Sequence, residues 1–94
     1  MPRNYMVFLS KRALRQLKRL PRDIVGRLRA RLRVLKGDPF QSRSGADISM
    51  VWGHDDPPLY RLLVGGYRVL YFVLEEEVRI TEILHRSRAF RGLD

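Results

Sequence analysis

The sequence contains no cysteine and no long hydrophobic run. Without cysteine, a disulfide framework, a thiolate metal site and a cysteine nucleophile are excluded. The longest unbroken apolar stretch is the six residues from Val69 to Leu74, whereas a transmembrane helix needs about 20. The first residues, Met1–Asn4, are not followed by the apolar segment of a signal peptide. We therefore expect a cytoplasmic protein that does not bind a membrane.

Acidic residues are few, at 10 against 19 lysines and arginines, which gives a formal net charge of +9. Arginine accounts for 16 of the 19, and its planar guanidinium group suits phosphate better than lysine does. Residues 1–43 carry 13 basic and two acidic residues, a net +11, whereas residues 44–94 carry six and eight, a net −2. This imbalance indicates a polyanionic partner, either nucleic acid or an acidic protein, although a generic basic surface is the alternative.

The length of 94 residues allows one hydrophobic core, so we expect a single domain over residues 1–94. Hydrophobic residues make up 45% of the chain, which argues against disorder.

The N-terminal half predicts a strand followed by a helical hairpin. Tyr5–Leu9 is a short apolar run typical of a strand, and Ser10 after it is a candidate N-cap. Apolar residues then recur at helical spacing up to Leu20, and again from Ile24 to Leu35, with Pro21 between the two helices and Gly37 after the second. The outer face of the second helix carries basic residues that are candidates for binding nucleic acid or a protein partner: Arg29, Arg33 and Lys36.

The segment from Phe40 to Pro58 has no sustained period and is rich in glycine, serine and proline, so it predicts a long connection. Asp47–Trp52 is a short strand or turn within it, and we expect Trp52 to anchor the segment to the core, with a stacking platform as the alternative. His54–Asp56 is better explained by a solvated loop than by a metal site, since no partner lies at ligand spacing.

The C-terminal half predicts a three-stranded antiparallel meander. Leu59–Val64 and Tyr67–Leu74 flank Gly65–Gly66, which is the signature of a two-residue hairpin turn. Glu75–Glu77 forms the next turn and Val78–Leu84 the third strand. The whole chain is then an α+β domain in which the meander packs on the helices.

The register of this hairpin places Arg61 and Arg68 on one face of the sheet and the tyrosines on the other, against the helices. If the glutamate turn also has two residues, the odd positions of the last strand join the arginine side, including His85. Arg86 follows where alternation need not hold. Two arginines and a histidine would bind an anion and transfer a proton, which suits RNA cleavage by the 2′-OH. Each residue alone is also explained as an ordinary surface position.

The segment LYRLLVGGYRVLY at residues 59–71 and the His85–Arg86 pair resemble the RelE/ParE toxin superfamily. The resemblance covers almost the whole chain and implies the toxin of a toxin–antitoxin pair. RelE-like members cleave mRNA in the ribosomal A site without a metal ion or other cofactor, whereas ParE-like members poison DNA gyrase.

By the same resemblance, Arg61 and Arg68 match phosphate-binding arginines, Arg86 matches an arginine with an acid or transition-state role, and His85 matches an acid or base. Phe90 matches a tyrosine that stacks on the substrate base. Arg88 lies beside it as a further substrate-binding candidate. Leu63 stands where some members carry lysine.

The resemblance therefore implies a ribosome-dependent mRNA endoribonuclease, and we expect as its partners the ribosome, mRNA and an antitoxin with an acidic amphipathic segment. A ParE-like inhibitor of DNA gyrase is the first alternative. The second is a non-catalytic nucleic-acid-binding module, which would depend on the basic helices rather than on the sheet.

Overall fold

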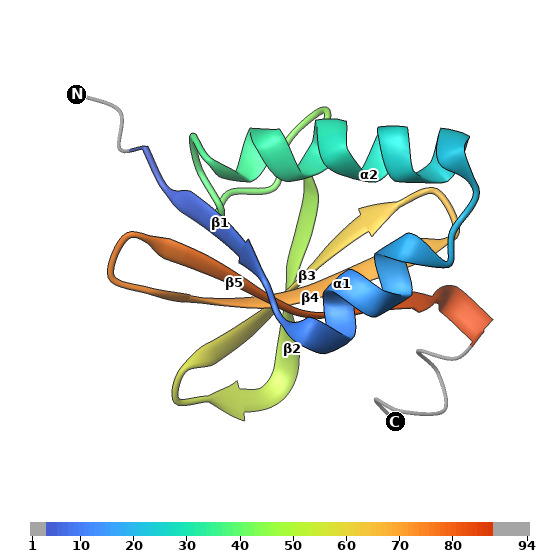
Figure 1. Ribbon diagram of the computed structural model, residues 1–94. Helices are drawn as coiled ribbons and strands as arrows, with labels where there is room; N and C mark the ends of the chain where they lie inside the picture. Colours follow the sequence, from blue (N-terminus) through green and yellow to red (C-terminus); the bar gives the residue numbers. More distant parts are fainter. Residues whose placement is uncertain (1–3, 88–94) are drawn as a thin grey trace.

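The computed structural model describes residues 4–87 as a five-stranded sheet with two helices (Figure 1). The strand order is β1-β5-β4-β3-β2, with β1 parallel to β5 and all other pairs antiparallel. The predicted α+β class is therefore confirmed. In chain order the elements are β1 (Met6–Leu9), α1 (Lys11–Lys18), α2 (Arg22–Leu35), β2 (Asp47–Asp55), β3 (Pro58–Val64), β4 (Tyr67–Leu74) and β5 (Glu77–His85).

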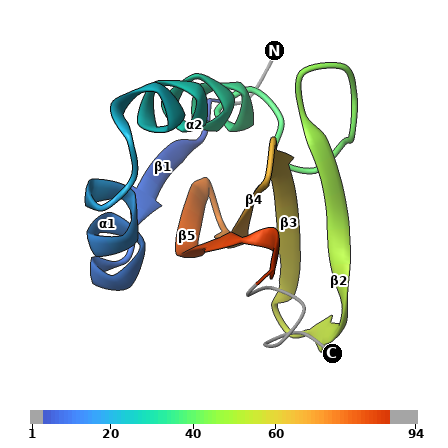
Figure 2. The same cartoon turned by 90° about the vertical axis from the view of Figure 1, so that its right-hand side faces the viewer.

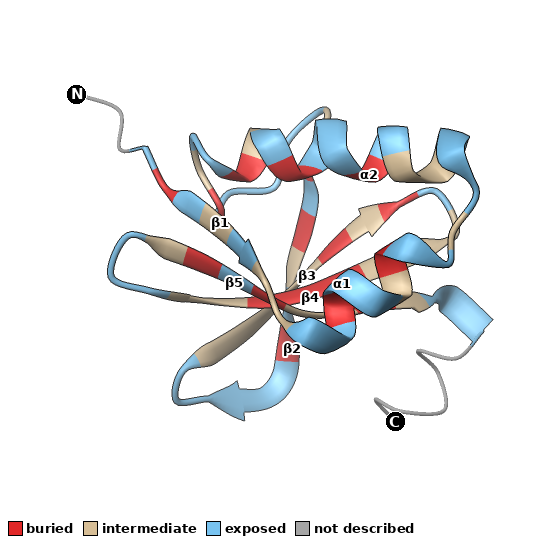
Figure 3. Cartoon of the chain, in the orientation of Figure 1, coloured by how far each residue is buried: buried red, intermediate tan, exposed pale blue. Residues whose placement is uncertain are grey.

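The two helices begin where the sequence predicts. The Ser10 hydroxyl accepts the Ala13 backbone N–H at 3.0 Å and caps α1, and Pro21 stands immediately before α2. Leu28, Leu32 and Leu35 form the buried stripe of α2, and Figure 3 shows this stripe facing the sheet. Neither helix in residues 4–87 is long and apolar enough to cross a membrane.

Helix α1 covers an edge of the sheet that β1 leaves open. β1 pairs with β5 only as far as Ile80, so no strand within residues 4–87 lies on that side of the rest of β5. The Ser10 hydroxyl donates to the Thr81 carbonyl at 2.8 Å, and the Gln16 side-chain oxygen accepts the Ile83 N–H at 2.7 Å. These side chains satisfy backbone groups that an open edge would leave unpaired. Figure 2 shows α1 beside β1 and β5, with β2 at the far edge.

The tyrosine side of the hairpin packs on the helices, as predicted. Tyr71 is completely buried, its hydroxyl donates to the Pro39 carbonyl at 2.7 Å, and its ring stacks on Tyr60 with 5.6 Å between centroids. Burial raises the pKa of the Tyr71 hydroxyl. This contact fixes the chain that leaves α2 against the centre of the sheet.

The prediction of a long connection from Phe40 to Pro58 was wrong for the second half of this segment. Asp47–Asp55 forms the nine-residue strand β2, which is longer than the short strand allowed for at this position. β2 owes its strand conformation to backbone pairing with β3, which outweighs a local sequence of glycine and aspartate. Trp52, predicted as an anchor to the core, is 97% exposed.

Candidate functional site

The side of the sheet away from α2 carries Arg61, Leu63, Arg68, Leu70 and Phe72, which we call the arginine face. Pairing of Arg61 with Leu70 and of Leu63 with Arg68 confirms the register predicted from the Gly65–Gly66 turn. Arg61 and Arg68 are diagonal neighbours, with Cα atoms about 7–8 Å apart. The two arginines thus share one face of the sheet, on neighbouring strands whose register is fixed by backbone pairing.

Arg61 is held in place by Ser49 on β2. The two residues are cross-strand partners, and the Ser49 hydroxyl accepts hydrogen bonds from Arg61 Nε at 3.2 Å and from Nη2 at 3.1 Å. Part of the guanidinium is thereby oriented, while its remaining donors are available to an anion. Sequence reasoning missed Ser49, because only the strand β2 brings it opposite Arg61.

Arg68 lies between two apolar cross-strand partners, Leu63 on β3 and Leu84 on β5. Its side chain is half-buried, and the next residue on its own face, Leu70, is only 3% exposed. A charge partly removed from water interacts more strongly with an anion than an exposed one does. Arg61 is half-buried as well, so both arginines are placed to stabilise a developing negative charge.

His85 does not join the arginine face, so that part of the prediction was wrong. The glutamate turn does have two residues, since Leu74 pairs with Glu77. However, Leu70 pairs with Glu82 and Tyr71 with Ile80, so Thr81 is an extra residue in β5. This β-bulge reverses the alternation of every later side chain.

The bulge places His85 beside Tyr67, on the side of the helices. The two residues are cross-strand partners, and their rings meet edge to face with 5.3 Å between centroids. His85 Nδ1 lies 3.0 Å from the Ser87 hydroxyl. Ile83, also expected on the arginine side, is buried in the core. His85 therefore contacts the chain that follows β5, at Ser87, rather than Arg61 or Arg68.

Arg86 stands next to the hairpin turn. Its backbone N–H donates to the Gly66 carbonyl at 2.8 Å, and its side chain is exposed. The turn is possible because Gly65 has a φ of 58°, which favours glycine. Arg88 and Phe90, predicted as substrate-binding residues, lie outside the described residues.

The basic residues of the second helix form a separate surface. Arg29, Arg33 and Lys36 are all exposed, as predicted, and lie on and just after α2 rather than on the arginine face. Arg29 borders a groove of about 260 Å³ between the helices, whose floor includes Leu14, Leu17 and Val25. Residues 4–87 contain no group of three histidines, aspartates or glutamates arranged to hold a metal ion.

Known proteins match the chain over most of its length. A family model for the ParE toxin of the type II toxin–antitoxin system parDE matches residues 7–90. A chain in the crystal structure of the archaeal RelE–RelB complex from Pyrococcus horikoshii OT3 is 30% identical, with a TM-score of 0.77 over 92% of this chain and 99% of that one. None of the curated proteins is a significant match.

A second solved structure shares the fold. It is a chain of the RelB–RelE antitoxin–toxin complex from Methanococcus jannaschii, with 21% identity and a TM-score of 0.72 over 93% of this chain and 99% of that one. The family model and the Pyrococcus relative go further than the fold, because each covers nearly the whole chain. The chain therefore belongs to the RelE/ParE superfamily, as a toxin of a type II toxin–antitoxin system.

Proposed function

We propose that this toxin cleaves mRNA on the ribosome and that the arginine face holds the scissile phosphate. The observation that carries the proposal is that Arg61 and Arg68 lie as diagonal neighbours on a sheet surface that the helices leave uncovered. The 30% identity with a chain of a RelE–RelB complex supports the same branch of the superfamily. Because its target would be the translating ribosome, the proposal also places the toxin in the cytoplasm.

In the proposed reaction, the RNA 2′-oxygen attacks the adjacent phosphorus and the bond from phosphorus to the 5′-oxygen breaks. The products are a 2′,3′-cyclic phosphate and a 5′-hydroxyl, and the proton lost from the 2′-OH is balanced by one gained at the 5′-oxygen. Arg68 would stabilise the charge on the phosphoryl oxygens, and Arg61 would bind and orient the phosphate. The His85 ring lies on the other side of the sheet from the arginines, so it would not touch the substrate. It would instead act as a positioning residue, which holds the backbone after β5 through its contact with Ser87.

The test is primer extension on mRNA from translating ribosomes, with purified toxin variants. Arg61→Ala and Arg68→Ala should each slow cleavage by about 10- to 100-fold, the effect of losing a hydrogen bond to a charged group. Arg15→Ala is the matched control, since it removes one exposed arginine of α1 that has no part in the site. Arg68 is half-buried, so Arg68→Lys, which keeps charge and stem, serves as its second variant. Undiminished cleavage by both alanine variants would refute the proposal.

Gyrase inhibition is the second candidate function, and the match to the ParE family model favours it. The two candidates differ in what the purified toxin does to gyrase in the absence of ribosomes. Accumulation of gyrase-cleaved DNA, with mRNA left intact, would assign the toxin to the ParE branch. Dependence of growth arrest on Arg29, Arg33 and Lys36, with no cleavage of either nucleic acid, would instead indicate a binding module.

We also propose a cognate antitoxin as partner, because the two solved relatives are toxin–antitoxin complexes. The groove between α1 and α2 fits an acidic amphipathic segment. Leu14, Leu17 and Val25 offer an apolar floor, and Lys18 and Arg29 stand at its margin. Apolar contacts should make this complex less sensitive to salt than ribosome binding, which relies on phosphate contacts. Titration of both complexes against salt tests this order, and an antitoxin complex that dissociates first would contradict it.

A further inference from the structure

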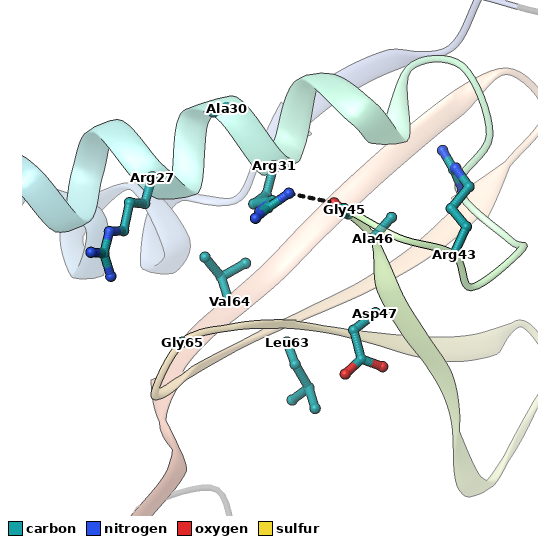
Figure 4. A pocket seen from close by; sticks show the side chains of 10 residues that line it. All are labelled: Arg27, Ala30, Arg31, Arg43, Gly45, Ala46, Asp47, Leu63, Val64 and Gly65. Atoms are coloured by element: carbon teal, nitrogen blue, oxygen red, sulfur yellow. Dashed lines mark hydrogen bonds between the residues drawn. The ribbon is translucent and has the colours of Figure 1, made fainter.

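A second cationic site lies at the margin of the sheet, in a cleft of about 550 Å³ between α2, the start of β2 and the end of β3 (Figure 4). We call it the α2 cleft. Arg27 and Arg31 line it from α2, one helical turn apart, and Arg43 lines it from the chain just before β2. None of these three arginines was singled out by the sequence for this site, because they line one cleft only when α2 packs over the sheet.

Two of the arginines are fixed by backbone carbonyl groups. Arg31 Nη1 donates to the Gly45 carbonyl at 3.0 Å, as Figure 4 shows. Arg43 donates from Nη1 to the Gln41 carbonyl at 2.6 Å and from Nη2 to the Val34 carbonyl at 3.2 Å. A neutral carbonyl orients a guanidinium group and leaves its charge uncompensated. Gly45, with a φ of 87°, also leaves room for this approach, because a Cβ there would lie 3.2 Å from Arg31 Nη1.

The cleft is lined by three arginines and, within residues 4–87, by a single carboxylate, that of Asp47. No ion pair in this part of the chain involves Arg27, Arg31 or Arg43. The Asp38 carboxylate is bound by the Phe40 and Gln41 N–H groups, and these bonds, together with the charge of Arg43, lower its pKa. Asp47 points away from α2 (Figure 4). The cleft therefore attracts an anion.

The cleft opens beside the arginine face. Leu63 lines it, and Leu63 is the cross-strand partner of Arg68. Figure 4 shows Val64 directed toward α2 and Leu63 away from it, so the two residues mark the passage from one side of the sheet to the other. An anion in the cleft and one on Arg68 would lie on a continuous path around the end of β3.

We propose that the α2 cleft binds a backbone phosphate of RNA, with Arg27 and Arg31 as its principal donors. This inference rests on the proposed ribosomal function and extends it by a second contact. The phosphate belongs either to the mRNA that is cleaved or to ribosomal RNA, and the chemistry of recognition is the same for both. A line of phosphates matches a path that continues from one arginine cluster to the next.

The experiment measures the affinity of the toxin for ribosomes with and without an mRNA that is 2′-deoxy at the cleavage site, across a range of salt concentrations. Arg27→Ala should weaken binding about 5- to 10-fold at low salt and reduce the log–log salt slope by about 0.7, as expected for one lost phosphate contact. Arg15→Ala, which also replaces an exposed helical arginine, is the control for charge alone and should change the slope less. Arg31→Lys should weaken binding too, because lysine keeps the charge but loses the planar fork.

Comparison of ribosomes with and without mRNA distinguishes the two sources of phosphate. An effect of Arg27→Ala that needs the mRNA assigns the cleft to the mRNA, and an effect on both kinds of ribosome assigns it to ribosomal RNA. If parent and Arg27→Ala bind with the same affinity and slope, the inference is wrong while the proposed function stands. If Arg27→Ala weakens antitoxin binding and leaves ribosome binding unchanged, the cleft is a binding site for the antitoxin and the inference is overturned. A parent that does not bind ribosomes would overturn the proposed function and the inference together.

Discussion

Replacement of Ser49 by alanine should impair the toxin without unfolding it. Ser49 touches the site only through Arg61, whose Nε and Nη2 both donate to its hydroxyl. In Ser49→Ala the guanidinium keeps its charge but loses the acceptor that orients it. Ordering a long side chain costs about 0.5–1.5 kcal/mol. In the parent the Arg61 side chain is already ordered by Ser49, whereas in the variant this free-energy cost arises when the substrate binds. Cleavage should therefore slow roughly 2- to 13-fold.

The assay is single-turnover cleavage of ribosome-bound mRNA by the parent, Ser49→Ala, Arg61→Ala and the double variant. If Ser49 acts through Arg61, it has nothing to orient once Arg61 is alanine, so the double variant should be no slower than Arg61→Ala. Ser49→Thr keeps a hydroxyl on the strand and should recover most of the rate. The thermal midpoint of Ser49→Ala should stay close to that of the parent, because the lost bonds are only partly buried.

An additive double variant would refute the reasoning. It would mean that Ser49 acts independently of Arg61, and that the hydrogen bonds between them have no role in orienting the phosphate-binding group. A large fall in thermal midpoint for Ser49→Ala would point to a structural role in the pairing of β2 with β3 instead. Either result would also weaken the assignment of Arg61 to the site.

Three further outcomes are expected. Tyr71→Phe leaves the Pro39 carbonyl buried without its donor, so it should cost about 1–3 kcal/mol and lower the thermal midpoint by about 4–8 °C per kcal/mol. Because burial raises the pKa of Tyr71 above 10.0 in the folded protein, the unfolded chain loses this proton first, and stability should fall as the pH rises above about 10. Urea midpoints at about pH 9 and pH 11 should show a smaller fall for Tyr71→Phe than for the parent. Phe90→Tyr should preserve cleavage and Phe90→Ala reduce it about 5- to 150-fold, if the ring stacks on a base, and equal rates for all three would exclude stacking.

The parts of the fold that follow from local patterns were predictable from sequence. Paired glycines at Gly65–Gly66 define a two-residue turn, and the turn alone determines that Arg61 and Arg68 share a face. The same holds for Ser10 and Pro21, whose side-chain chemistry specifies where the helices begin. Each of these features depends on residues close together in the chain.

The features that were missed depend on distant contacts. The bulge at Thr81 is not visible in the sequence of β5, which alternates acceptably in either register. It is stabilised by Ser10, whose hydroxyl binds the Thr81 carbonyl across 71 positions of the chain. One inserted residue was enough to move His85 to the opposite side of the sheet. The position of Ser49 opposite Arg61 was not predicted for a similar reason, since β2 is specified by pairing with β3 rather than by its own composition.

The parallel pairing of β1 with β5 has a consequence for the synthesis of this toxin. Met6–Leu9 leave the ribosome before their partners, Glu77–Ile80, which are 71 positions further along the chain. At about 5–20 residues per second, roughly 4–14 s pass before the strand with which β1 pairs has been synthesised. The contacts of Ser10 and Gln16 with β5 form after a similar delay, because their partners are 71 and 67 positions further along the chain. A nascent chain that stops before β5 thus has no edge on which β1 and α1 can dock, so the protein becomes a folded toxin only after β5 has been synthesised.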